Sequence, residues 1–230
     1  MPKLNKQYLL IISLIMLLVN ALLIFFMVSF DRIIYIIFFY HVPSAWLSYF
    51  SFGVSLICHI LYLKKKEIKW SLNGKNSVII GLIFSAFTLI SGSLWFNATS
   101  GNYNSIYWQW SDYRQTMTLV LFFSFLSLLV FSNMTDERVE KARMTALLGI
   151  VLFPMVPLSY FSAIIFSSLH PLITPDPSQS GHIYWDSLKI ICLLINLIAI
   201  TLFYFYSIQQ LLEIDMAKEQ LERILEEKNT

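Results

Sequence analysis

Six long apolar segments restrict the fold of this chain more than any other feature of its sequence. A helix that crosses the hydrocarbon core of a bilayer needs about 20 consecutive, mostly apolar residues. No Asp, Glu or Arg lies inside the six segments, and Lys189, at the edge of the last, is their only lysine. We therefore predict an all-α, polytopic membrane protein with six transmembrane helices. The segments are residues 8–30, 44–63, 78–96, 116–132, 146–166 and 188–208.

The composition indicates that lipid is the solvent for most of the chain. Hydrophobic residues make up 57% of the 230 positions and charged residues only 13%, whereas about a quarter of a soluble domain is charged. The two cysteines, Cys58 and Cys192, lie far apart inside apolar segments. Because they form no CxxC pair, the sequence supports neither a thioredoxin-like redox motif nor a cysteine-based zinc site.

The distribution of lysine and arginine predicts how the chain is oriented, because cytoplasmic connections carry an excess of both. Six spans place the two termini on one side, together with the connections 64–77 and 133–145. That side holds thirteen Lys and Arg residues, and the other holds Arg32, Arg114 and Lys189. We therefore predict cytoplasmic termini. The first apolar segment is too long for a signal peptide and lacks a small-residue cleavage site, so we interpret it as an uncleaved span.

The last 21 residues differ from the rest of the chain. We assign residues 1–209 to the membrane domain and residues 210–230 to a cytoplasmic, amphipathic helical tail. Leu211, Ile214, Leu221 and Leu225 recur at helical spacing along the tail. Such a helix is expected to lie on the protein or on the lipid surface, and a coiled coil with a partner is the less favoured alternative.

Tryptophan is concentrated on the side of the membrane opposite the termini. An interfacial aromatic belt normally decorates both faces of a membrane protein, but the cytoplasmic side has only Trp70. The one-sided concentration therefore favours a binding platform over a belt. Its densest part is IYWQWSDYRQT at residues 106–116. The outer tryptophans are Trp46, Trp95, Trp108, Trp110 and Trp185.

Two outer histidines each stand beside a proline at the expected end of a span. His41 precedes Pro43, which we expect to open the second helix, and His170 precedes Pro171, which ends the fifth. A bare metal site needs three or four ligands, but the outer side has no cysteine and few carboxylates. Two histidines suffice for haem iron, which brings four equatorial ligands of its own. Structural helix caps and a proton or ion pathway are the alternatives.

Other residues on the outer side suit a porphyrin. Tryptophan and tyrosine rings can stack on its apolar plate, and Arg32 and Arg114 are candidate partners for its two propionates. The remaining histidines are weaker candidates. His182 lies in the polar stretch DPSQSGHIYW. His59 lies among apolar neighbours in the inner half of the second segment, where an interhelical hydrogen bond is its simplest role.

Five motifs in order resemble the cytochrome c maturation protein C family, also called haem exporter protein C. The resemblance covers roughly residues 30–175. It departs from the family pattern where Ser111 replaces a tryptophan before Asp112, and where NATSGNYNS lengthens the stretch after Trp95. The motifs are RIIY (32–35), HVPSAW (41–46), SGSLW (91–95), DYRQT (112–116) and SSLHP (167–171).

The resemblance implies a specific function at the inner membrane. His41 and His170 would be the axial ligands of a transient haem b on the periplasmic face, beside the tryptophan-rich segment. The protein would pass haem to a periplasmic haem chaperone for cytochrome c maturation. It would work in the lipid bilayer beside an ATP-binding cassette transporter and a small single-span subunit. We expect no nucleic acid among its partners. The expected haem-binding residues are His41, His170, Trp95, Trp108, Trp110, Asp112, Arg114 and Arg32.

Two other functions remain open at this point. A cytochrome c synthase would attach haem itself, but such proteins are generally larger than this chain. A small-solute transporter would be expected to carry ionisable residues near the middle of the membrane or paired broken helices. The spans lack the charges, although Pro154 and Pro157 interrupt the fifth. No catalytic triad or carboxylate dyad is visible on the outer side, so we do not expect an enzyme.

The orientation can be tested by cysteine labelling from the outer side. In a chain without Cys58 and Cys192, a membrane-impermeant thiol reagent should modify Ser105→Cys and should not modify Asn73→Cys. The expected difference follows from the thirteen cationic residues on the side of Asn73. The reverse labelling pattern would overturn the predicted orientation.

Overall fold

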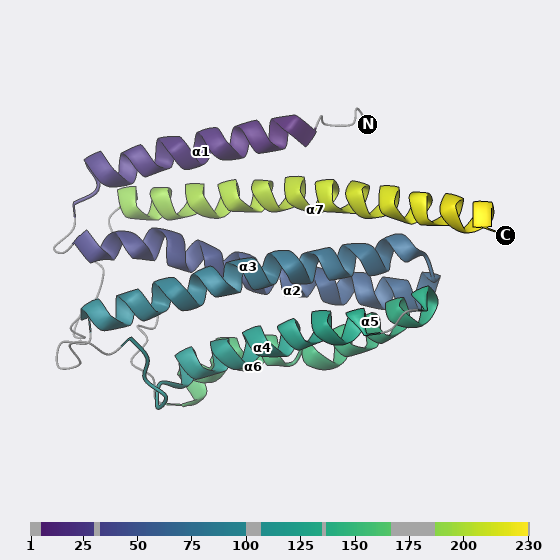
Figure 1. Ribbon diagram of the computed structural model, residues 1–230. Coiled ribbons are helices and arrows are strands. Elements are labelled where there is room, and N and C mark those ends of the chain that lie inside the picture. Colours follow the sequence, from purple (N-terminus) through teal and green to yellow (C-terminus); the bar gives the residue numbers. More distant parts are fainter. Residues whose placement is uncertain (1–5, 30–32, 100–106, 135–136, 167–186, 230) are drawn as a thin grey trace.

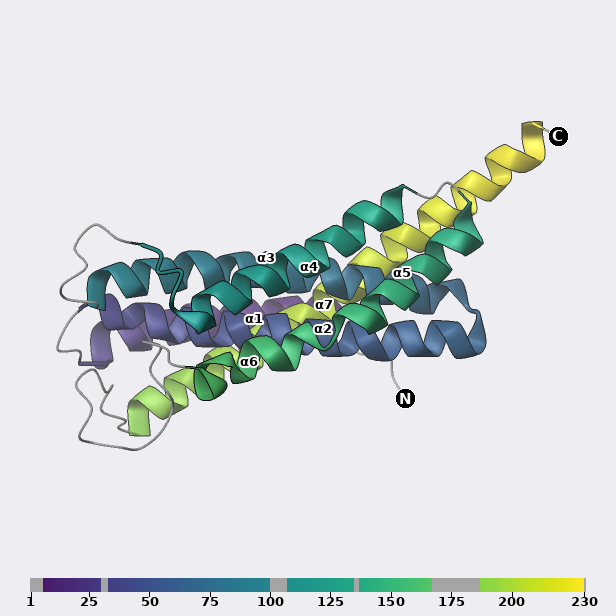
Figure 2. The ribbon, with the colours of Figure 1, turned by 90° about the horizontal axis from the view of Figure 1, so that it is seen from below.

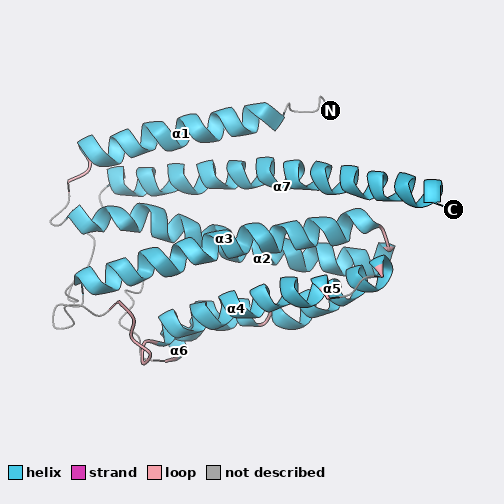
Figure 3. Cartoon of the chain, in the orientation of Figure 1, coloured by secondary structure: helices cyan, strands magenta, loops and turns pink. Residues whose placement is uncertain are grey.

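The computed structural model describes residues 6–29, 33–99, 107–134, 137–166 and 187–229, and within these ranges it contains helices and no strand. The order of elements along the chain is shown in Figures 1 and 3. The helices are α1 (Lys6–Met27), the 3-10 helix η1 (Ile33–Ile37), α2 (Phe38–Lys65), α3 (Ile68–Thr99), α4 (Tyr113–Asn133), α5 (Arg138–Leu152), α6 (Met155–Ile165) and α7 (Ser187–Asn229).

Six helical stretches are long and apolar enough to cross a membrane, which confirms the predicted multi-pass architecture. The stretch from η1 into α2 starts at Ile34, well before the predicted residue 44, whereas α1 ends at Met27 rather than at residue 30. Helices continue past the apolar core because each turn satisfies its own backbone groups, so hydropathy alone does not place their ends. The spans are Lys6–Met27, Ile34–Lys65, Ile68–Ala98, Tyr113–Asn133, Arg138–Ile165 and Ser187–Glu222.

The α2–α3 hairpin forms the centre of the bundle, with α1 and α7 on one side and α4, α5 and α6 on the other (Figure 1). Lys66 adopts a left-handed conformation with φ of 58° after α2, and its N–H donates to the carbonyl of Tyr62 at 2.8 Å. We call this end of the bundle the Lys66 end. It also holds both termini and the α4–α5 connection, while α2, α4 and α7 begin at the opposite end, the His41 end (Figure 2).

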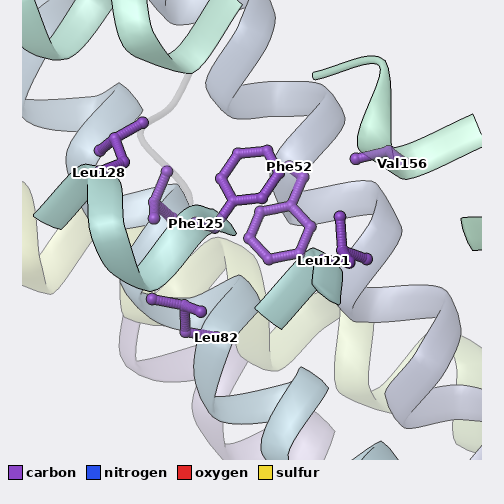
Figure 4. Packing of buried hydrophobic residues seen from close by; sticks show 7 residues of the cluster. Phe52, Leu82, Leu121, Phe125, Leu128 and Val156 are labelled. Carbon is purple, nitrogen blue, oxygen red and sulfur yellow. The ribbon is translucent and has the colours of Figure 1, made fainter. Parts of the chain in front are cut away.

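The tightest part of the core joins α2, α3, α4 and α6. The rings of Phe52 and Phe125 stack with their centroids 3.9 Å apart (Figure 4). Gly81 permits this packing, because a Cβ there would lie 2.7 Å from the Phe52 ring. Lipid offers no hydrophobic drive for helix association, so close packing of this kind has to hold the spans together. The buried cluster consists of Phe52, Val78, Leu82, Leu121, Phe125, Leu128 and Val156.

Proline affects two of the spans in different ways. The expectation that Pro43 opens the second helix is wrong, because α2 begins at Phe38 and Pro43 lies inside it, fully buried. The expected interruption of the fifth span is confirmed. Pro154 separates α5 from α6, and Pro157 occupies the first turn of α6, where its missing N–H is tolerated.

The final helix continues from the membrane domain into the tail without a break. Its part after residue 209 contacts three other helices at the Lys66 end. Lys6 of α1 forms an ion pair with Glu213, and Arg138 of α5 forms one with Glu219. Asn76 of α3 donates to the Asp215 carboxylate at 2.9 Å. Beyond these contacts α7 projects away from the other helices (Figure 2).

His59 occupies a slot between two glycines rather than bridging two helices by a hydrogen bond. Its ring is fully buried, and its Nδ1 lies 3.4 Å from the Ser55 hydroxyl of the same helix, so the predicted interhelical hydrogen bond is wrong. A Cβ at Gly74 of α3 would lie 2.5 Å from the ring, and a Cβ at Gly149 of α5 would lie 2.0 Å from Nδ1. The ring therefore fits only because both neighbours lack a side chain.

This slot predicts that Gly149→Ala destabilises the bundle. The added methyl group would overlap the His59 ring, and overpacking of a core costs about 1–3 kcal/mol. Thermal unfolding of the detergent-solubilised protein should show a lower midpoint for Gly149→Ala. The loss should be reduced in the Gly149→Ala/His59→Ala double variant. Gly53→Ala is the matched control, since a Cβ there would meet nothing within 4 Å. Equal losses in the single and double variants would contradict the slot.

Candidate functional site

The His41 end collects most of the residues predicted to bind haem. His41 lies in the first turns of α2, Trp95 near the end of α3, and Trp108 and Trp110 just before α4. Arg32, His170 and His182 lie outside the described residues. Asp112 is the N-cap of α4, and Arg114 lies in its first turn. The structure thus brings together six of the eight predicted residues at one end of the bundle, and the other two, Arg32 and His170, are not described.

The six residues so placed are His41, Trp95, Trp108, Trp110, Asp112 and Arg114. No group of three or more His, Cys, Asp or Glu side chains that could hold a bare metal ion occurs among the described parts of the chain. His41 is therefore the strongest candidate for a metal ligand in the described ranges, and its surroundings decide which nitrogen could serve.

His41 is oriented by two neighbouring residues of α3. Its Nδ1 lies 2.9 Å from the Ser91 hydroxyl, and its Cε1 would lie 3.2 Å from a Cβ placed on Gly92. Ser91 has one hydroxyl proton, which it donates to the carbonyl of Phe87. With this proton directed to Phe87, the Ser91 oxygen can accept from His41, so the contact favours the tautomer with the proton on Nδ1. A neutral histidine held in this way is the form that ligates metals.

Sequence reasoning missed this role of Ser91 and Gly92. Both belong to the SGSLW motif, whose order in the chain predicts no contact with His41. One signal could have revealed the contact. A serine and a glycine, Ser91 and Gly92, stand side by side near the end of one predicted span, and His41 stands near the start of the span before it.

Trp95, at the other end of the same motif, packs against η1. Its ring centroid lies 5.2 Å from that of Tyr35, with the planes inclined at 38°. Tyr35 belongs to the RIIY motif, and its element leads directly into α2. The contact therefore joins the end of α3 to the segment that precedes His41.

The aromatic segment before α4 is not a flat shelf. The rings of Trp108 and Trp110 lie 5.7 Å apart at 65°, an edge-to-face arrangement, so their planes cannot both stack on one plate. Trp110 is 71% exposed and Tyr107 is 54% exposed, whereas the Trp108 Nε1 is buried and makes no hydrogen bond within the described chain. Trp110 and Tyr107 thus present open aromatic surface, and Trp108 supports the turn below them.

Asp112 has a clear structural task as the N-cap of α4. Its buried carboxylate accepts from the backbone N–H groups of Arg114 at 3.0 Å and Gln115 at 3.1 Å. Gln115 in turn accepts from the N–H of Gln109 at 3.0 Å, in a variant of the capping box. Thr116 donates to the carbonyl of Trp110 at 3.1 Å. The D-x-R-x-T motif therefore sets the course of the tryptophan-bearing turn.

Arg114 joins the beginning of α4 to α6. Its guanidinium donates to the carbonyl oxygens of Ser159, at 3.5 Å, and Tyr160, and it lies 5.4 Å from the centre of the Tyr160 ring. All these contacts are to uncharged groups, so the Arg114 charge is not neutralised by them. These contacts hold the guanidinium of Arg114 at the His41 end, where an anionic group could pair with it.

Comparison with known proteins shows extended similarity. The profile of the family described as "Heme exporter protein C" matches residues 3–227. A "Heme exporter protein C" from Bradyrhizobium diazoefficiens is 33% identical over 73% of this chain and 61% of its own length. A "Putative cytochrome c biosynthesis ccmC-like mitochondrial protein" from Marchantia polymorpha is 32% identical over 60% and 54%. A "Heme exporter protein C" from Escherichia coli K12 is 26% identical over 67% and 62%. The chain thus matches a little over half of each relative's length.

The capping geometry predicts a graded effect of substitutions at Asp112. Asp112→Ala removes the acceptor for two N–H groups and should lower the free energy of unfolding by about 0.5–2 kcal/mol. Asp112→Asn keeps one oxygen acceptor and should lose less. Denaturation in detergent, followed by tryptophan fluorescence, would measure both. If Asp112→Ala is as stable as the wild type, the cap contributes nothing and a direct ligand role for Asp112 gains support.

Proposed function

The chain belongs to the heme exporter protein C family, and from this premise we propose that it holds haem at the His41 end and releases it for cytochrome c maturation. The observation that carries the proposal is the contact between His41 Nδ1 and the Ser91 hydroxyl. In the tautomer that this contact favours, the Ser91 oxygen accepts a hydrogen bond from Nδ1–H, and Nε2 is the nitrogen that would meet iron. Haem is the cargo of the protein in this proposal, and haem b is the form we expect.

The second axial ligand in the proposal is His170, from the α6–α7 connection. Two histidines from different parts of the chain, one in α2 and one in the α6–α7 connection, can hold haem iron on opposite faces of the porphyrin, which supplies the four equatorial nitrogens. Such a site needs no base or nucleophile. Either ligand can leave when a competing histidine approaches, so the same geometry that binds haem also permits its transfer.

The other residues of the site have divided roles in this proposal. Trp110 and Tyr107 offer exposed aromatic surface to the porphyrin, with Trp95 and Trp108 holding the adjoining turns. Arg114 and Arg32 would pair with the propionates. Asp112 would act first through the α4 cap, in which its Oδ1 accepts from two N–H groups.

Orientation and partners complete the proposal. Most of the described lysines and arginines gather at the Lys66 end, in Lys64–Lys66 of α2, the first turns of α3 and α5, and the tail of α7, whereas Arg114 and Lys189 lie at the His41 end. We infer that this end faces the cytoplasm and that the His41 end faces the periplasm across the inner membrane. The recipient would be a periplasmic haem chaperone. The companions would be an ATP-binding cassette transporter and a small single-span subunit.

A histidine series tests the axial ligands. His41→Ala and His170→Ala should each lower the haem content of the purified protein and change its Soret and visible bands, because one axial ligand is lost. The double variant should deliver little less haem than the worse single variant. External imidazole should partly restore either spectrum by filling the vacated position.

His59→Ala and His182→Ala are the controls, with haem measured per folded protein. Both should retain the wild-type spectrum, since neither histidine is assigned to the iron. Loss of binding in His182→Ala with no change in His170→Ala would move the second ligand to His182. No spectral change in any of the four variants would refute the bis-histidine site.

A further inference from the structure

The turn that carries His41 has a defect in its backbone hydrogen bonding. Pro43 has no N–H, so it cannot donate to the carbonyl of Phe39, its partner four residues earlier in α2. A proline ring also pushes that carbonyl away from the helix axis. Inside a membrane, no water is available to replace the missing donor. A buried carbonyl without a hydrogen-bond donor costs about 1–3 kcal/mol of folding free energy.

Asn196 of α7 supplies a replacement donor. Its Nδ2 lies 2.7 Å from the Phe39 carbonyl oxygen, and the two side chains are 2% and 0% exposed. Phe39 also packs in a buried cluster with Ile24 of α1 and Cys192 of α7. The amide of Asn196 therefore reaches the defect from a helix far away in the sequence, inside a tightly packed junction of α1, α2 and α7.

We propose that Asn196 is a positioning residue for His41: it completes the backbone hydrogen bonding that Pro43 interrupts, and it thereby fixes the turn from which the histidine reaches its ligand position. The proposal rests on the proposed function of His41 as a haem ligand. The turn is held on two sides. Asn196 binds the backbone at Phe39, and Ser91 of α3 binds the His41 ring at 2.9 Å.

The chain offers a matched control for this role. Asn20 of α1 also donates through Nδ2 to a helix carbonyl, that of Cys192, at 2.8 Å, and it is also fully buried. The residue four positions after Cys192 is Asn196, which has its N–H, so the Cys192 carbonyl keeps an intrahelical donor. Replacement of Asn20 therefore deletes a similar hydrogen bond, but the Cys192 carbonyl still has its donor within the helix.

The decisive experiment is a double-mutant cycle between positions 43 and 196. Asn196→Leu keeps the branched shape of the side chain but removes the donor. In the wild-type background it should weaken haem retention about tenfold, which corresponds to about 1.4 kcal/mol of binding free energy. It should also reduce the share of protein that shows the bis-histidine spectrum. In a Pro43→Ala background, residue 43 supplies its own N–H to Phe39, so the same substitution should change retention less than about twofold. Asn20→Leu should also change retention less than about twofold.

A second readout does not require haem. Hydrogen–deuterium exchange of the amides at residues 38–42 in the haem-free, detergent-solubilised protein should be faster in Asn196→Leu. It should return to the Pro43→Ala rate in the Pro43→Ala/Asn196→Leu variant. Asn20→Leu should leave these amides unchanged.

The outcomes separate this inference from the proposed function. If Asn196→Leu has equal effects with Pro43 and with Ala at position 43, in exchange and in retention, the positioning role is refuted while haem binding stands. If the exchange cycle shows the expected coupling but the wild-type protein binds no haem, the proposed function fails and the backbone role of Asn196 survives. A loss of retention in Asn20→Leu as large as in Asn196→Leu would also refute the specific role.

Discussion

Every part of this bundle depends on the need to satisfy backbone hydrogen bonds where no water is present. The prolines show two ways of meeting it. At the junction of α5 and α6, the chain adopts tighter turns: the N–H of Phe153 donates to Ile150 at 3.3 Å, and that of Val156 donates to Phe153 at 2.8 Å. In α2 the helix stays continuous, and the Asn196 side chain donates to the interrupted turn from another helix.

The choice between these two solutions has consequences for the site. A local rearrangement ends one helix and begins another, and it changes the direction of every side chain that follows. A donor borrowed from α7 lets α2 run unbroken through Pro43, so that His41 remains in register with Ser91 of α3. The ring then contacts one serine, whose own proton is directed to the carbonyl of Phe87, and this favours the tautomer with the proton on Nδ1.

The sequence predicts the spans well because apolar length is a property of each segment alone. The predicted helix start at Pro43 is wrong, because the donor that replaces the missing proline N–H comes from Asn196, about 150 positions away. No local pattern reveals such a donor. The sequence does not predict the slot around His59 for the same reason, since Gly74 and Gly149 come from two other helices. The D-x-R-x-T motif is an intermediate case. An aspartate followed three residues later by glutamine is a capping signature readable from sequence, although the edge-to-face geometry of the tryptophans it supports is not.

The continuity of α7 has a mechanical consequence. Its 43 residues form one rod of about 65 Å at the usual rise per residue, beginning at the end where His41 lies and finishing past the opposite face. A rod without a hinge cannot tilt at one end and stay still at the other. We therefore expect a displacement of its first turns, beside the junction with Phe39, to be transmitted to Glu213, Asp215 and Glu219 and to strain three polar contacts at once.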